Sequence, residues 1–193
     1  MTLVLDAAPL VAVADRRDSL NSSVAALLRE EPGELGIPAP VTAEVDSLLR
    51  RRLGHSARRA LLDNTTAGRF TVAGLEPEDH KVVADLERHY DDLDVGLADL
   101  SVLVVARRFR TRRILTFDQR HFRALRPLDG GRVTLLPSDA TAGGAPAGAT
   151  SKVRECCRTG GKSPNRTPGP RWWVRDPGAP DHSIESRQTM TLI

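Results

Sequence analysis

The chain has few cysteines, few aromatic residues and no long apolar run. Of its 193 residues, only Cys156 and Cys157 are cysteines, and they are adjacent and close to the C-terminus. Residues 1–138 therefore hold neither a disulfide framework nor a thiolate metal site, which fits a reducing, cytoplasmic setting. The longest purely apolar stretch, residues 102–106, is far shorter than the roughly 20 residues of a membrane-spanning helix, so we expect no membrane contact.

Signals of several other protein classes are also missing. The N-terminal stretch MTLVLDAAPLVAVADRR has no basic start, and Asp6 interrupts its apolar run, so we interpret it as a strand and a helix rather than as a signal peptide. The five histidines are scattered, without the spacing of zinc ligands. Neither GxxxxGK[ST] nor GxGxxG occurs, so the common phosphate-binding loops are excluded.

The composition divides the chain near Pro137. Residues 1–138 carry 20 Lys and Arg and 20 Asp and Glu, so the net charge of +3 comes from the remainder. Residues 139–193 hold 7 of the 15 glycines and 6 of the 13 prolines, without sustained periodicity. We therefore predict a folded domain over residues 1–138 and a low-complexity, disordered tail over residues 139–193.

Short β-rich runs alternate with amphipathic segments along residues 1–138. We expect strands at residues 2–5, 35–37, 70–72, 113–116 and 133–136. Helices are expected at residues 9–13, 20–29, with Ser19 as its cap, 41–53, 55–67, 77–90, 96–108 and 119–125. This alternation predicts an α/β fold, a three-layer α/β/α sandwich around a central parallel sheet.

Four carboxylates lie in apolar segments: Asp6, Glu44, Asp99 and Asp118. Asp6 and Asp118 follow expected strands, and Glu44 and Asp99 lie near the starts of helices that begin at the same edge of the sheet. These ends converge in a parallel sheet, so we expect the four acids to meet there. Oxygen-only clusters suit Mg²⁺ or Mn²⁺, and a divalent-metal site is the leading interpretation.

Each acid also has a purely structural explanation. The three aspartates suit the capping of helix N-termini. Glu44 lies at the edge of the apolar stripe of its helix, where an ion pair with Arg51 or Arg52 would satisfy it, whereas Asp46 is expected to point toward solvent. Asp94 is a fifth candidate ligand, although its acidic turn is more simply a solvated charge run.

Three segments together resemble a PIN-domain ribonuclease, more narrowly a toxin of the VapC type. They are LVLDAAPLVAVAD, PAPVTAEVDSLL and GLADLSVLVVARRFRTRRILTFDQRHFRALRP, and the resemblance covers residues 1 to about 138. It implies a parallel sheet between helices and an acidic pocket that binds Mg²⁺ or Mn²⁺ and cleaves RNA. By motif match, the metal-binding and catalytic residues are Asp6, Glu44, Asp99 and Asp118.

The resemblance carries further expectations. Asp6 and Asp99 would ligate the metal directly, and Glu44 and Asp118 would ligate or orient water. A VapB-type antitoxin would hold the toxin inactive, and a homodimer is typical of the family. One residue departs from the pattern, because many members carry Ser or Thr where this chain has Ala8. This departure puts in doubt one contact that helps to hold the metal site.

An acidic pocket repels RNA, so a cationic rim is required. The candidate cations are Arg50, Arg51, Arg52, Arg107, Arg108, Arg110, Arg112, Arg113, Arg120, Arg123 and Arg126. Two alternatives stay open. One is a catalytically weakened PIN-fold module that only binds RNA or an antitoxin. The other is a phosphoacceptor receiver domain, which is disfavoured because the last expected strand, RVTLLPSD, offers no lysine.

Overall fold

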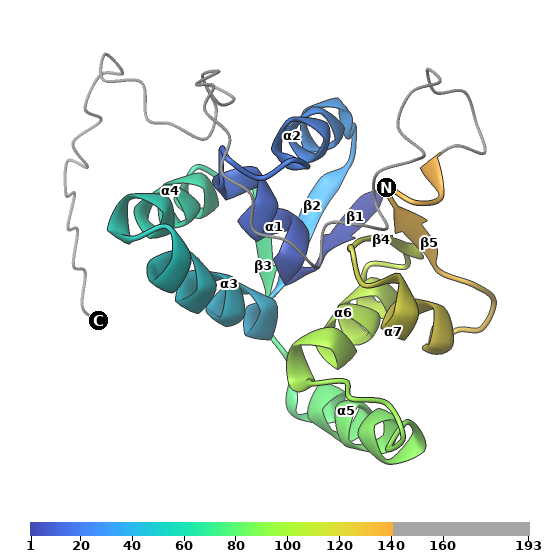
Figure 1. Ribbon diagram of the computed structural model, residues 1–193. Coiled ribbons are helices and arrows are strands. Elements are labelled where there is room, and N and C mark those ends of the chain that lie inside the picture. The colour runs from blue at the N-terminus through green and yellow to red at the C-terminus, as the bar shows by residue number, and fades with distance from the viewer. Residues whose placement is uncertain (141–193) are drawn as a thin grey trace, which may run out of the picture.

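The structure, a computed structural model, describes residues 1–140 (Figure 1). Its strands are β1 (Thr2–Leu5), β2 (Glu34–Pro38), β3 (Thr71–Ala73), β4 (Arg113–Leu115) and β5 (Thr134–Leu136). Its helices are α1 (Ala7–Ala14), α2 (Asn21–Glu30), α3 (Ala39–Arg52), α4 (His55–Thr66), α5 (Pro77–His89), α6 (Leu97–Arg108) and α7 (Gln119–Ala124). Every expected strand and helix is present, with ends displaced by at most two residues. The tail from residue 141 onward, with both cysteines, lies outside the described residues.

The five strands form one parallel sheet in the order β3-β2-β1-β4-β5, flanked by helices (Figure 1). The chain builds outward from β1 to β3 and then returns to the other side of β1 with β4. The direction of winding therefore reverses between β1 and β4. In open parallel sheets, ligands bind beyond the carboxyl ends of the strands at such a reversal. The fold thus places the residues that follow β1 and β4 at a favoured position for a site.

The core consists of β1 and the helices that pack around it. Leu3, Val4 and Leu5 are fully buried, as befits the central strand of a parallel sheet. Helix α6 is buried continuously from Leu100 to Ala106, and it packs against α3, α5 and the sheet, as its apolar sequence predicts. No helix within residues 1–140 is long and apolar enough to cross a membrane.

Helix α2 begins differently from the sequence-based expectation. Leu20, not Ser19, is its N-cap residue, and the carboxylate of Asp18 accepts a hydrogen bond of 2.8 Å from the backbone N–H of Leu20. The expected capping by Ser19 is therefore wrong. The first residue of the helix, Asn21, is buried and donates from its side-chain amide to the carbonyl oxygens of Ala12 (3.1 Å) and Val13 (2.7 Å). The end of α1 thus determines where α2 starts.

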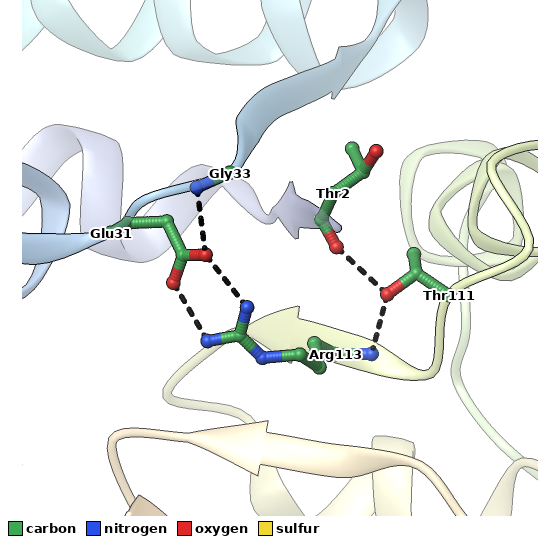
Figure 2. A network of polar contacts seen from close by, with 5 residues as sticks. All are labelled: Thr2, Glu31, Gly33, Thr111 and Arg113. Atoms are coloured by element: carbon green, nitrogen blue, oxygen red, sulfur yellow. Dashed lines mark hydrogen bonds and ion pairs between the residues drawn. The ribbon is translucent and has the colours of Figure 1, made fainter.

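A polar network closes the amino end of the sheet, where β1 and β4 begin (Figure 2). Arg113 donates from both terminal nitrogens to the two carboxylate oxygens of Glu31, each at 2.7 Å, and one of these oxygens also accepts from the N–H of Gly33. The hydroxyl of Thr111 donates to the carbonyl oxygen of Thr2 at 2.7 Å and accepts from the N–H of Arg113. These contacts tie the loop before β2 to β4.

Candidate active site

Asp6 is the innermost acid of the candidate site. It directly follows β1, its side chain is the N-cap of α1, and it is only 6% exposed. One carboxylate oxygen, Oδ1, accepts from the N–H of Ala7 at 2.7 Å, and the other, Oδ2, accepts from the hydroxyl of Thr116 at 2.7 Å. The capping role that the sequence suggests is real, and it holds the carboxylate at the reversal between β1 and β4.

The surroundings of Asp6 disfavour its negative charge. Burial raises the pKa of Asp6 to about 6, although the hydrogen bonds from Thr116 and Ala7 act in the opposite direction. The nearby carboxylates of Asp99 and Glu44 raise this pKa further. The fold therefore brings Asp99 and Glu44 near enough to Asp6 for their charges to act on it. A bound cation would relieve both the burial and the repulsion.

Thr116 is a residue of the site that the sequence analysis did not single out. Its side chain is fully buried, and its hydroxyl donates to Asp6 while accepting a 3.0 Å hydrogen bond from the N–H of Asp118. It follows β4 in the segment LTFD. The sequence feature that could have predicted this role is a hydroxyl residue between a buried strand and a candidate acid. Threonine is so common in strands that this feature is only a weak indication.

Both carboxylate oxygens of Asp118 contact one residue, His121. Its Oδ1 accepts from the backbone N–H of His121 at 3.0 Å, which caps α7 as the structural explanation predicted. Its Oδ2 lies 2.8 Å from Nδ1 of the same histidine. Asp118 is not among the charges that shift the pKa of Asp6. Its connection to Asp6 runs through the hydroxyl of Thr116.

Asp99 lies in the first turn of α6 and is half-buried. Its Oδ2 accepts a hydrogen bond of 2.9 Å from the N–H of Gly96, so it also closes the start of the helix. The second carboxylate oxygen, Oδ1, has no hydrogen bond to residues 1–140 and is available to a ligand. Capping and a role in the site are therefore compatible in this residue.

Glu44 is the most accessible of the four acids. It is exposed on α3, and no ion pair joins it to Arg51, Arg52 or any other residue within 1–140. The alternative of a structural ion pair is therefore wrong for Glu44. The expectation for its neighbour Asp46 is also wrong, because Asp46 is half-buried and pairs with Arg58 of α4 at 2.6 Å. Because α4 packs against α3, the face of α3 that carries Asp46 is partly buried.

The donor set fits a hard divalent cation held partly by water. Within residues 1–140, no three His, Cys, Asp or Glu side chains lie close enough to ligate one ion together. Mg²⁺ usually keeps several waters and takes only one or two protein carboxylates, so a looser group of acids suits it.

Ala8 is exposed beside Asp6, and its methyl group supplies no ligand or hydrogen bond. Asp94 is exposed in the turn before α6.

Ion pairing changes the set of cations available to a substrate. Four of the expected rim arginines bind carboxylates of the protein itself: Arg108 pairs with Asp79, Arg112 with Asp129, Arg113 with Glu31, and Arg123 with Asp139. Their side chains stabilise the fold and are less available to phosphate groups. The other expected rim arginines carry no ion pair within residues 1–140 and stay candidates.

The comparisons with known proteins point to one family. The family model described as the PIN domain matches residues 3–126. Ribonuclease VapC26 of Mycobacterium tuberculosis strain H37Rv is 34% identical over 135 residues, which are 70% of this chain and 100% of that protein.

Two solved structures share the fold. The first is VapC20 of Mycobacterium tuberculosis, a toxin that cleaves the sarcin-ricin loop, with a TM-score of 0.58, 19% identity, and coverage of 61% of this chain and 91% of that chain. The second is VapBC2 of Rickettsia felis bound to a DNA fragment from its promoter, with a TM-score of 0.53, 15% identity, and coverage of 70% and 98%. At these identities the likeness concerns the fold alone.

Proposed function

This chain belongs to the PIN domain family, and from that membership we propose that it is a metal-dependent endoribonuclease that acts as the toxin of a toxin–antitoxin pair. The observation that carries the proposal is the position of Asp6 at the reversal of the sheet, where burial raises its pKa to about 6 and the carboxylates of Asp99 and Glu44 add to the rise. A buried carboxylate with two anionic neighbours is costly without a cation, and the cost is explained if the site binds one.

Asp6 and Asp99 would hold the cation, which is Mg²⁺ or Mn²⁺. When bound, such an ion lowers the pKa of a coordinated water and stabilises negative charge on phosphate oxygens. Asp6 is fixed for this task by Ala7 and Thr116, and Asp99 by its bond to Gly96. These supporting hydrogen bonds keep ligand oxygens in place and thereby tune affinity.

Glu44 and Asp118 would orient water for attack on the scissile phosphate. Glu44 is exposed, so its carboxylate would be free to accept hydrogen bonds from an incoming water. Asp118 keeps a fixed direction because His121 binds both of its oxygens. Acceptors in fixed positions lower the activation barrier, because the attacking water is already ordered before the reaction.

The proposal includes partners and location. RNA is the substrate, and a VapB-type antitoxin is the inhibitory partner. VapBC2 is a complex of the two kinds of chain, which supports an antitoxin for this protein as well. We further propose that the active form is a cytoplasmic homodimer.

The decisive experiment is cleavage of total RNA by the full chain. We expect cleavage with Mn²⁺ or Mg²⁺, none with a chelator, and none from the Asp6→Asn variant. Sequencing of the new RNA ends would identify the target. RNA binding without cleavage under any metal condition would instead support the weakened binding module, an alternative that the missing hydroxyl at Ala8 favours.

A further inference from the structure

Four arginines surround a hollow on the side of the molecule away from the acids. The hollow has a volume of about 680 Å³ and lies between the end of α1, the end of α3 and the start of α4. Arg16 and Arg17 follow α1, Arg52 ends α3, and Arg59 lies in α4. Figure 1 shows α1, α3 and α4 packed side by side, and α1 contacts α3 as α3 contacts α4. Arginines from three segments of the chain therefore line one hollow.

These four arginines are not neutralised by the protein. All four are exposed, and none has a side-chain hydrogen bond or ion pair with another of residues 1–140. Their neighbour Arg58 behaves differently, since Asp46 binds it at 2.6 Å. Two aspartates also line the hollow, and one of them, Asp15, uses an oxygen to accept from the backbone N–H of Arg17 at 2.9 Å. The hollow is therefore positively charged.

Helices α1 and α3 both run from the acids toward the hollow. Asp6 caps the start of α1, and Arg16 lies just beyond its end. On α3, Glu44 precedes Arg52 by two turns. At 1.5 Å per residue, the path from Asp6 to Arg16 is about 15 Å long and the path from Glu44 to Arg52 is about 12 Å long. Stacked nucleotides rise by about 3.4 Å along one strand, so about four of them span these distances.

We propose that this hollow is a second RNA subsite, which binds backbone phosphates of the substrate about four nucleotides away from the scissile bond. The proposal rests on the ribonuclease activity proposed above. The acids of the site repel a polyanion, so the attraction that holds RNA must come from cations placed elsewhere. The guanidinium group of arginine can donate two hydrogen bonds to the oxygens of one phosphate. Leu53, Ala57 and Ala60, which also line the hollow, offer an apolar surface against which a ribose or a base can pack.

The first test measures binding without cleavage. A fluorescently labelled 12-nucleotide single-stranded RNA is titrated with the full chain in chelator, over a range of salt concentrations. The test variant carries Arg16→Gln, Arg52→Gln and Arg59→Gln. The control variant carries Arg29→Gln, Arg69→Gln and Arg132→Gln, which are exposed arginines outside the hollow. Both variants lose the same charge, and thermal melting checks that both fold.

We expect the test variant to bind at least tenfold more weakly than the control. Its salt dependence should flatten by up to about 2 in the logarithmic slope, because each lost phosphate contact on a single strand contributes about 0.7. Equal affinities and equal slopes for the two variants would overturn the proposal. A polyglutamate peptide that binds as tightly as RNA and responds to the same substitutions would overturn the choice of RNA as ligand.

The second test uses cleavage of RNAs of increasing length. For long substrates, the test variant should raise KM about tenfold and leave kcat unchanged, while trinucleotides should be cleaved as the unmodified chain cleaves them. A change in kcat, or the same loss at every length, contradicts a remote subsite. If the unmodified chain binds RNA through the hollow but cleaves nothing, the proposed activity fails and the subsite stands. If it cleaves while the variants behave alike, only the subsite fails.

Discussion

The hydroxyl of Thr116 donates a hydrogen bond of 2.7 Å to the carboxylate of Asp6, although the two residues are 110 positions apart in the sequence. The same oxygen accepts from the backbone N–H of Asp118. One buried hydroxyl thus joins the end of β1 to the segment that follows β4, at the reversal of the sheet. The site is supported from its interior, where water cannot replace the contact.

Thr116→Val keeps the shape of the side chain and removes this hydroxyl. We expect a loss of about 2–3 kcal/mol in the free energy of unfolding, because a hydrogen bond to a buried charge is lost. The pKa of Asp6 should rise further, since the bond from Thr116 lowers it. Urea denaturation at pH 8 measures the loss. Thr134→Val, at an exposed position of β5, is the matched control, and an equal effect of both would contradict the assigned role.

Asp6→Asn should stabilise the fold at neutral pH while it abolishes cleavage. The folded-state pKa of about 6 lies above the ordinary value of 3.8, so the folded state holds a proton that the unfolded state releases between these pH values. The free energy of unfolding therefore falls as the pH rises through this window. A shift of about two units corresponds to about 3 kcal/mol, which sets the upper limit of the gain.

The measurement for Asp6→Asn is chemical denaturation at pH 4 and pH 8 in chelator. We expect a gain at pH 8 that largely disappears at pH 4, where the carboxyl of Asp6 is protonated in the folded protein. Asp91→Asn, at an exposed position, is the control and should change stability little at either pH. A gain of the same size at both pH values would show that charge burial is not its cause.

Asp99→Asn separates the ligand role of this residue from its capping role. Asparagine keeps an oxygen that accepts from Gly96 but loses the charge, so the fold should lose less than about 1 kcal/mol while RNA cleavage drops by at least a hundredfold. Asp79 offers a matched control, because it accepts from the N–H of Glu76 in the same way at the start of α5. Cleavage should survive Asp79→Asn. Full activity of Asp99→Asn would remove this acid from the site.

Arg113→Gln tests the network at the amino end of the sheet (Figure 2). The side chain of Glu31 is only 3% exposed, so loss of its partner leaves a buried charge and should cost about 3 kcal/mol at pH 7. The hydrogen bond from Arg113 holds the pKa of Glu31 below its usual value. The stabilisation is therefore present above the pKa of an unfolded glutamate and is lost as the pH falls through the lower folded value.

For Arg113→Gln, we expect denaturation curves that differ most from those of the unmodified chain at pH 7 and approach them as the pH falls through the lowered pKa of Glu31. Arg88→Gln is the control, since Arg88 pairs with Asp85 on the surface and such pairs contribute less than about 1 kcal/mol. RNA cleavage under folding conditions should be unchanged, because the network lies at the opposite end of the sheet from the acids. A cost that does not depend on pH would argue against the ion pair.

Local pattern was sufficient for most of the fold. Strand and helix periods, with Pro and Gly at the boundaries, predicted every element within residues 1–140 to within two residues at either end. Helix α2 is the instructive exception. Its expected cap at Ser19 ignored Asn21, whose side chain binds carbonyl oxygens at the end of α1. A helix start that depends on another helix is invisible to a local pattern.

The sequence by itself determined which residues follow the strands, and hence that Asp6 and Asp118 stand at the carboxyl edge of a parallel sheet. It determined equally that Asp99 begins the most apolar helix. Only the tertiary structure decided which oxygens bind which donors: Thr116 joins two of these acids, and Asp46 rather than Glu44 pairs with an arginine. The reason is physical. Periodicity follows from the backbone, whereas side-chain pairing depends on distances between segments that the linear order leaves open.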